Sequence, residues 1–406
     1  MNSSFRSRLG SALAYRDFRF LWVATACQST GFGMDNVALG WLVYELTGDP
    51  FMVGVTAGLR MIPLFLLGIV SGAVADRVDR RVLLRIVTLT GAINMFILGS
   101  LLVSGINSVW MVIAMATLIG VSFSFLLTLR QAYTYDIVGP NNSLNGLSML
   151  QIASQGGAVF GSLIAGFLIE SIGVGWQFVV VGGTYFLSVL VLLGARESGQ
   201  SASQEKSSIL SNLVGYVSLL KDYPILFTLM CLAATTEIFG FTHMSLVPVF
   251  TKDVLGVGAG ALGVLTAIRQ LGGFLGLAAL ALLGDYRGKG KLMFAITICF
   301  GLGQILFFAV DGVVFFAFVL LLVNACAMAV DTLYKTLMQE NVPNRDRGRA
   351  MGGWVLSIGT APIGHLGIGA IAGSFGAPVA LLFNGVVLAS AGVVTSLSLG
   401  KVRRLP

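Results

Sequence analysis

Charged residues are scarce in this sequence. Of its 406 residues only 11% are charged, whereas 56% are hydrophobic, and the mean hydropathy is +0.89. A soluble domain of this length could not keep so much apolar surface away from water, so the composition excludes the ordinary soluble classes. Lipid is therefore expected to be the main solvent of the chain.

Cysteine and histidine are also rare, with four and two copies respectively. The cysteines fall in apolar runs without metal-ligand spacing, and His243 and His365 lie on different runs, so the sequence predicts no metal site. We expect both histidines to have helix-packing roles. The sequence also has no phosphate-binding loop, which excludes ATP as the energy source, and no serine nucleophile in a recognisable turn. We therefore expect neither catalysis nor a cofactor.

Long apolar runs recur along the whole chain. A membrane-spanning helix needs about 20 predominantly apolar residues, and the runs reach this length. They predict an all-α membrane protein with twelve transmembrane helices, at about 19–43, 51–75, 82–103, 109–131, 146–170, 175–195, 224–249, 259–283, 291–310, 313–338, 350–372 and 377–399.

The basic residues are distributed unevenly between the segments that separate these runs. Twenty of the 25 Lys and Arg residues lie in the N-terminal arm, in the C-terminal tail or in four inter-run segments, namely Arg77–Arg85, Arg196–Lys221, Arg287–Lys291 and Arg345–Arg349. The alternate segments contain one basic residue between them, Lys252. Because basic loops stay in the cytoplasm, this asymmetry predicts that both termini are cytoplasmic, and it weakens a nucleic-acid-binding interpretation of the net charge of +7.

The only long polar segment lies between the sixth and seventh runs. It begins with a Ser- and Gln-rich linker composition, and apolar residues at helical spacing over 208–220 then predict an amphipathic helix along the inner membrane surface. We therefore expect an N-terminal six-helix bundle over 1–195, a cytoplasmic linker over 196–223, and a C-terminal six-helix bundle with a short basic tail over 224–406.

An internal repeat relates these two halves. A shift of 209 residues aligns 54–83 with 263–292 without a gap. The aligned pairs include Gly54/Gly263, Arg60/Arg269 and Asp76/Asp285. Apolar bias alone would match several leucines and valines, but it would not readily match an intramembrane arginine and a loop aspartate in one register. The repeat predicts two pseudo-symmetric bundles.

A short charged loop separates the second and third runs, so it can lie only at the membrane surface. In it, Gly72, Asp76, Arg77, Arg80 and Arg81 form the pattern G-x-x-x-D-R-x-x-R-R. This pattern resembles the signature loop of the major facilitator superfamily of secondary transporters. The segments 15–22, 41–48 and 342–349 resemble one bacterial branch of it, which contains enterobactin-exporter-like and macrolide-efflux-like transporters.

The resemblance implies a role for this loop as an inner gate. Asp76 would face the positive N-terminus of the eleventh span, an interaction worth about 0.3–1 kcal/mol at an exposed site. Arg77, Arg80 and Arg81 would add salt bridges and lipid headgroup contacts, and Asp285 belongs to a degenerate second copy of the loop. Alternatively, the charges serve only as a topology signal. The family pattern has a glycine where this chain has an aspartate at position 79, which leaves the tightness of the turn open.

Five ionisable residues within the predicted spans are candidates for proton coupling or for lining a substrate cavity. A charge at the bilayer centre costs about 2.5 kcal/mol or more, so such residues usually face a cavity or a partner. The neighbouring spans predict two equivalent pairs, Asp35 with Arg60 and Glu237 with Arg269. Each pair is either a permanent ion pair or a carboxyl that loads and releases a proton when the helices rock apart. Asp331 is a third acidic candidate, although a helical i,i+4 pair with a lysine also explains it.

These observations lead us to expect a secondary transporter of the bacterial inner membrane. It would export an amphipathic or hydrophobic small molecule, such as a drug or a siderophore, in exchange for protons. The substrate, protons and the lipid bilayer would be its partners, without nucleic acid, and the resemblance implies a monomer. Two alternatives stay open, namely proton-coupled uptake of a small solute and a lipid flippase or scramblase.

Overall fold

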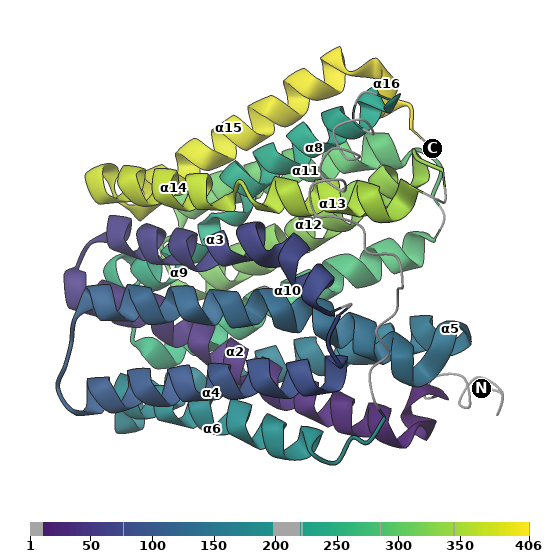
Figure 1. Cartoon of the computed structure of the whole chain (residues 1–406). Helices are drawn as coiled ribbons and strands as arrows, with labels where there is room; N and C mark the ends of the chain where they lie inside the picture. Colours follow the sequence, from purple (N-terminus) through teal and green to yellow (C-terminus); the bar gives the residue numbers. More distant parts are fainter. Residues whose placement is uncertain are drawn as a thin grey trace. The chain divides into compact units, whose positions relative to one another are not determined.

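The computed structural model describes residues 11–75, 77–197, 220, 222–284, 286–343 and 346–405. Within these ranges the secondary structure is helical, without strands. Ten helical segments of the described chain are long and apolar enough to cross a membrane (Figure 1). The prediction of an all-helical membrane protein is therefore confirmed.

The described residues group into two compact units. The first takes in the described parts of Met1–Leu42, Ile62–Ile209 and Gly258–Ala267. The second takes in those of Val43–Met61, Leu210–Val257 and Ile268–Pro406. Nearly all of the predicted linker and its amphipathic helix lie outside the described residues, so those expectations stay predictions.

The first unit is built from long helices joined by short turns. Its elements are η1 (Ser11–Ala14), most of α2 (Arg16–Thr47), the second half of α3 (Pro50–Ala75), α4 (Arg80–Val103), α5 (Val109–Ile172), α6 (Val174–Leu192) and the start of α10 (Ala259–Leu283). Helices α4 and α6 run side by side (Figure 1). Glycine allows this approach, because a Cβ atom on Gly99 would lie 2.7 Å from the backbone nitrogen of Val179.

Helix α5 is too long to be one membrane crossing. Its 64 residues would extend roughly 96 Å as a straight helix, about three times the ~30 Å apolar core of a bilayer. It breaks at Gly139, whose φ of 70° lies in the left-handed region that favours glycine, and Pro140 follows. The two arms contain the apolar runs predicted at 109–131 and 146–170.

The second unit contains the remaining helices. Its elements are the end of α2, the first part of α3, α8 (Pro224–Thr236), η2 (Glu237–Phe241), α9 (His243–Val249), η3 (Phe250–Val254), most of α10, α11 (Lys289–Leu306), η4 (Phe307–Ala309), α12 (Val313–Glu340), α13 (Arg347–Ile358), α14 (Ala361–Phe375), α15 (Ala377–Ser398) and α16 (Gly400–Arg403). Helix α11 packs against both α12 and α15. Gly301 makes the second contact possible, because its Cβ would lie 2.7 Å from the carbonyl oxygen of Gly385.

The helix starts agree with the register of the sequence repeat. Helix α10 begins 209 residues after α3, and α11 begins 209 residues after α4. The sequence match between 54–83 and 263–292 therefore corresponds to two equivalent helix–loop–helix segments.

Candidate functional site

Glu237 lies where the run from α8 to α9 widens into the π-helical turn η2. The residue is only 8% exposed, and within the described chain its side chain makes no hydrogen bond or ion pair. The charged groups that act on it electrostatically are Asp331 and Lys335. Single π-turns inside α-helices are frequent at functional sites, and a lone buried carboxyl is costly in a membrane helix. Glu237 is therefore the centre of the candidate site.

Asp331 on α12 is held by two donors. Its Oδ2 accepts from Lys335 Nζ at 2.7 Å, and its Oδ1 accepts from Trp354 Nε1 at 2.7 Å. Lys335 Nζ also lies 4.0 Å from the centroid of the Trp354 ring. The predicted i,i+4 pair between Asp331 and Lys335 is thus present. Trp354 escaped the sequence reasoning, because a tryptophan in an apolar run is usually explained by packing.

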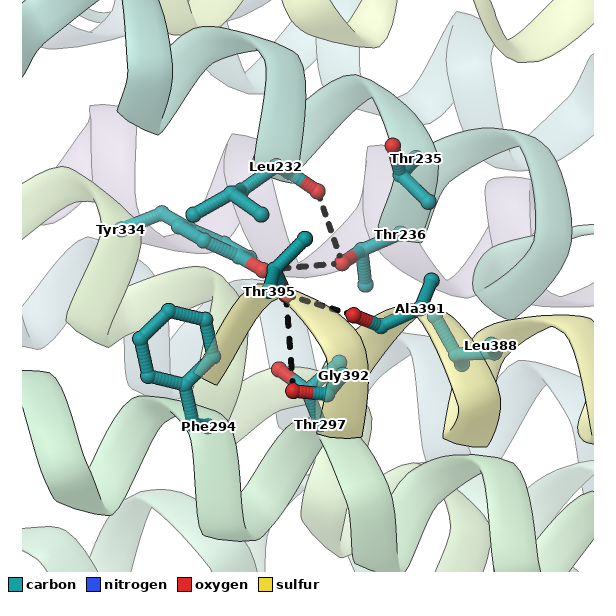
Figure 2. A pocket seen from close by; sticks show the side chains of 10 residues that line it. All are labelled: Leu232, Thr235, Thr236, Phe294, Thr297, Tyr334, Leu388, Ala391, Gly392 and Thr395. Carbon is teal, nitrogen blue, oxygen red and sulfur yellow. Dashed lines mark hydrogen bonds between the residues drawn. The ribbon is translucent and has the colours of Figure 1, made fainter. Parts of the chain in front are cut away.

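A hydrogen bond between hydroxyl groups fixes Glu237 near this cluster. Thr236, directly before Glu237, lies with its Oγ1 3.0 Å from the phenolic oxygen of Tyr334 on α12 (Figure 2). Because Tyr334 lies between Asp331 and Lys335 in the sequence, this bond joins the start of η2 to the same part of α12.

Figure 2 shows a small cavity beside this bond. Its lining comprises Leu232, Thr235, Thr236, Phe294, Thr297, Tyr334, Leu388, Ala391, Gly392 and Thr395. The cavity volume is about 30 Å³, which suits a water molecule and falls far below the roughly 300–1,000 Å³ of small-molecule sites. This cavity is therefore too small to hold a transported molecule.

Two side chains donate hydrogen bonds to carbonyl groups of the π-turn. Gln304 on α11 donates to the carbonyl of Phe239 at 3.1 Å, and His243 Nδ1 donates to the carbonyl of Gly240 at 2.7 Å. A membrane offers no water for such groups, so internal partners of this kind are needed. The sequence reasoning named the histidine only as a packing residue and missed the glutamine, although a polar side chain in an apolar run is a usable signal.

A second layer of polar contacts surrounds these donors. Asn324 Nδ2 lies 3.3 Å from His243 Nε2, and Asn384 Nδ2 donates to Thr242 Oγ1 at 3.0 Å. His365 Nδ1 lies 3.3 Å from the hydroxyl of Ser245. Both histidines are therefore buried members of a hydrogen-bond network, which fits the packing role expected for them. The described part of the chain contains no group of three or more His, Cys, Asp or Glu side chains that could hold a metal ion.

The predicted pair of Glu237 with Arg269 does not form in this structure. Both residues are described, and no ion pair joins them; Arg269 instead acts electrostatically on His243. Thr236, directly before Glu237, instead forms a hydrogen bond with Tyr334 on α12.

The other predicted pair, Asp35 with Arg60, stays a prediction. Asp35 is buried in α2 of the first unit, and Arg60 lies on the part of α3 that belongs to the second unit.

The gate aspartates of the sequence motif, Asp76 and Asp285, both lie outside the described residues. Gly72 is described, and a Cβ atom there would meet no atom within 4 Å. Arg77 is exposed. The gate assignment therefore stays a prediction.

The turn before α4 does not require a glycine. Asp79 has a φ of −53°, and its carboxylate accepts hydrogen bonds from the backbone nitrogens of Arg81 and Val82 as the N-cap of α4. An aspartate is one of the preferred N-cap residues because it satisfies amide groups of the first turn. The departure from the family pattern is thus compensated locally.

Arg80 and Arg81 connect this loop to other helices of the first unit. Arg80 Nη1 lies 2.8 Å from Asp136 Oδ1 on α5, and the two side chains are only 6% and 7% exposed. Arg81 Nη1 donates to the carbonyl of Arg196, beyond the end of α6, at 2.5 Å. Asp136 had no part in the sequence expectations.

The two glycines aligned by the repeat both lie at very close helix crossings. A Cβ on Gly54 would lie 2.3 Å from the carbonyl oxygen of His365 on α14. A Cβ on Gly263 would lie 2.6 Å from the carbonyl oxygen of Ser162 and 3.0 Å from the backbone nitrogen of Gly166, both on α5. Any side chain at either glycine would force the helices apart.

Comparison with known proteins gives a family and a set of transporters. Residues 10–404 match the model of a family described as "Transmembrane secretion effector". The chain is 24% identical to the staphyloferrin A transporter of Staphylococcus aureus, over 85% of this chain and 87% of that protein. It is 25% identical to the enterobactin exporter EntS of Shigella flexneri, over 91% of this chain and 90% of that protein. It is 23% identical to the multidrug efflux pump Tap of Mycolicibacterium fortuitum, over 91% of this chain and 93% of that protein.

Solved structures show the same fold. The nucleoside transporter NupG superposes with a TM-score of 0.76 at 16% identity, over 96% of this chain and 100% of that one. A bacterial homologue of the human lysosomal transporter Spinster superposes with a TM-score of 0.74 at 16% identity, over 96% of this chain and 99% of that one. Because the family match covers nearly the whole sequence, this chain belongs to the transmembrane secretion effector family of major facilitator transporters, and it is not an enzyme.

Proposed function

We propose that this chain exports an amphipathic or hydrophobic small molecule, drug-like or siderophore-like, in exchange for protons. The observation that carries the proposal is Glu237, a buried carboxyl without a hydrogen-bond partner in the described chain, placed in a π-turn beside the Asp331–Lys335 pair. The names of three relatives, an enterobactin exporter, a multidrug efflux pump and a siderophore transporter, support the substrate class, and the first two support the outward direction.

The proposed architecture has twelve spans in two pseudo-symmetric six-helix bundles, over 1–195 and 224–406, joined by the linker 196–223. The two arms of α5 count separately and α2 adds a further span to the ten apolar segments. The chain would lie in the bacterial inner membrane as a monomer with both termini in the cytoplasm, as the distribution of basic residues favours. Rocking of the bundles about a midplane site would expose that site alternately to each side.

The charge balance favours Glu237 as the proton carrier. Glu237 and Asp331 contribute two negative charges when both are ionised, and Lys335 supplies one positive charge. Both oxygens of Asp331 already accept hydrogen bonds, so a proton on Glu237 is the simplest way to neutralise the cluster. Asp35 and Arg60 stay candidates in spans one and two, and Arg269 in span eight. Asp76, Asp285 and the loop arginines stay the proposed inner gate.

Two other functions remain in view. Proton-coupled uptake of a small solute would use the same carboxyl with the opposite substrate direction. A lipid flippase or scramblase would not need a coupling carboxyl, and it would transfer labelled headgroups in vesicles without a pH gradient.

The test uses inverted proteoliposomes with an inward-acid pH gradient. A fluorescent amphipathic cation should accumulate in vesicles with the wild-type chain, and Glu237→Gln should abolish this accumulation. Asp35→Asn tests the alternative coupling residue. Glu340→Gln is a matched control, because Glu340 lies on α12 in an exposed pair with Lys289, and it should transport normally. Gradient-independent behaviour of several structurally diverse dyes would refute proton-coupled drug export.

A further inference from the structure

Lys335 occupies a position with the chemistry of an organic-ammonium site. Its Nζ lies 2.7 Å from the Asp331 carboxylate and 4.0 Å from the centroid of the Trp354 ring. A cation within about 6 Å of an indole face is attracted by the ring, most strongly where water is excluded. An aromatic face and a carboxylate together are the elements that recognise ammonium groups, and here the occupant is a side chain of the chain itself.

The rest of the site is assembled without the help of Lys335. The indole of Trp354 donates its N–H to Asp331 Oδ1 at 2.7 Å, so the same side chain orients the carboxylate and offers its face to the cation. Withdrawal of the lysine would therefore leave the carboxylate and the ring in place.

Glu237 adds a second carboxyl group that interacts electrostatically with Lys335. Glu237 is 8% exposed and makes no hydrogen bond within the described chain, and it acts electrostatically together with Asp331 and Lys335. One ammonium thus faces two carboxyl groups. When Glu237 is ionised, Lys335 balances only one of the two carboxylates, so a proton or a further cation is electrostatically favoured at this site.

Lys335 is also the member that is able to leave. Its side chain is 31% exposed, against 11% for that of Asp331. A lysine carries a compact charge on a flexible four-carbon stem, and such stems can move the charge to a wetter region.

We propose that Glu237, Asp331 and Trp354 form a binding site for the cationic group of a transported substrate, and that Lys335 holds this site until the substrate displaces it. The inference rests on the proposed transport function and specifies its substrate as an organic cation with an ammonium-type group. It favours cationic drugs over anionic siderophore-like compounds.

Removal of Lys335 separates this proposal from a purely structural ion pair. A structural pair would lose stability in Lys335→Met and gain no affinity for anything, because the variant leaves a buried carboxylate behind. If Lys335 instead competes with the substrate for this site, its removal should let an external ammonium group bind more tightly. An increase of affinity on loss of a polar residue is the distinctive outcome.

The experiment measures equilibrium binding to the purified full chain in detergent with two probes. One is a dansylated alkylamine with a free ammonium group, and the other is its N-acetylated neutral analogue. Lys335→Met should lower the Kd of the ammonium probe at least tenfold and leave that of the neutral analogue unchanged. Lys335→Arg, which keeps the cation, should bind like the wild type.

Further variants test the remaining groups of the site. Trp354→Leu and Glu237→Gln should each raise the Kd of the ammonium probe severalfold. Lys289→Met is the control: it removes a lysine of α11 that pairs with Glu340 on α12, the helix of Asp331 and Lys335. It should change neither Kd. Lys335→Gln provides a second charge-free variant should Lys335→Met fail to fold, as judged by its thermal melt.

The outcomes distinguish this inference from the proposed function. Equal or weaker ammonium binding in folded Lys335→Met and Lys335→Gln would overturn the internal-cation site. If the neutral analogue binds and is transported as well as the ammonium probe, the cation preference is refuted while transport stands. Failure of both probes to move under a pH gradient, despite tighter ammonium binding in Lys335→Met, would count against the transport function alone.

Discussion

Arg80→Met should destabilise the protein by about 3–5 kcal/mol, because it removes the cation beside a buried carboxylate. Arg80 Nη1 and Asp136 Oδ1 are 2.8 Å apart. At that distance, and with an effective dielectric constant of about 20, the attraction is about 6 kcal/mol before the desolvation of both ions is subtracted. With side chains only 6% and 7% exposed, water cannot replace the lost partner.

The double variant Arg80→Met/Asp136→Leu removes both charges and should recover most of the lost stability, since apolar replacement of a buried ion pair is often neutral. The coupling energy from the complete double-mutant cycle should therefore be about 3 kcal/mol or more. The assay is the fraction of folded protein in detergent micelles during denaturant titration. Arg81→Met is the comparison: it loses the pair with Asp79, whose side chains are 23% and 28% exposed, and the hydrogen bond to the carbonyl of Arg196, so its cost should stay below that of Arg80→Met.

Transport by the four proteins of this cycle, namely the wild type, Arg80→Met, Asp136→Leu and the double variant, decides between two roles for Arg80. A structural role predicts that the double variant recovers transport together with stability. Recovery of stability without transport would assign Arg80 to the inner gate implied by the loop motif. A double variant as unstable as Arg80→Met alone would refute the ion-pair reasoning, because removal of the second charge should relieve the buried carboxylate.

Asp79→Ala should cost about 1 kcal/mol by removing the N-cap of α4, and Asp79→Asn should retain most of that stability in thermal melts. Gly263→Val should block transport by forcing α5 and α10 apart, and single-cysteine accessibility should report a shifted conformational equilibrium. Gly183→Val is its control, because a Cβ there meets no atom within 4 Å, and it should transport normally. Gln304→Leu should destabilise the fold by about 1–3 kcal/mol by leaving the Phe239 carbonyl unsatisfied, with faster amide exchange in η2.

Features that depend on length and periodicity could be read from the sequence. The apolar runs predicted the helices, because a bilayer fixes how many residues a span needs. The repeat predicted that Gly54 and Gly263 are equivalent, and both glycines do lie at close crossings of neighbouring helices. The break of α5 at Gly139 and Pro140 follows from the same local chemistry, since few other residues adopt a φ of 70°.

The residues that surround Glu237 could not be predicted from the length and periodicity of the apolar runs. Which neighbour a helical side chain faces depends on the rotation of its helix, and each residue advances that rotation by about 100°. A π-turn accommodates one extra residue, so it changes the facing of the segment around it. The sequence contains no sign of η2, and the prediction paired Glu237 with Arg269 because their spans are neighbours in the chain.

The neutral polar residues were missed for a related reason, and they explain how the site connects to the rest of its unit. Gln304 on α11 holds the backbone of the π-turn, and Asn384 on α15 binds Thr242 directly after it. Their partners lie on helices that are distant in the sequence, so the sequence alone does not reveal them. Any movement of α11 or α15 relative to α8 must break or exchange these hydrogen bonds. Glu237 lies within the turn that they stabilise, so we expect its surroundings to change whenever these helices move.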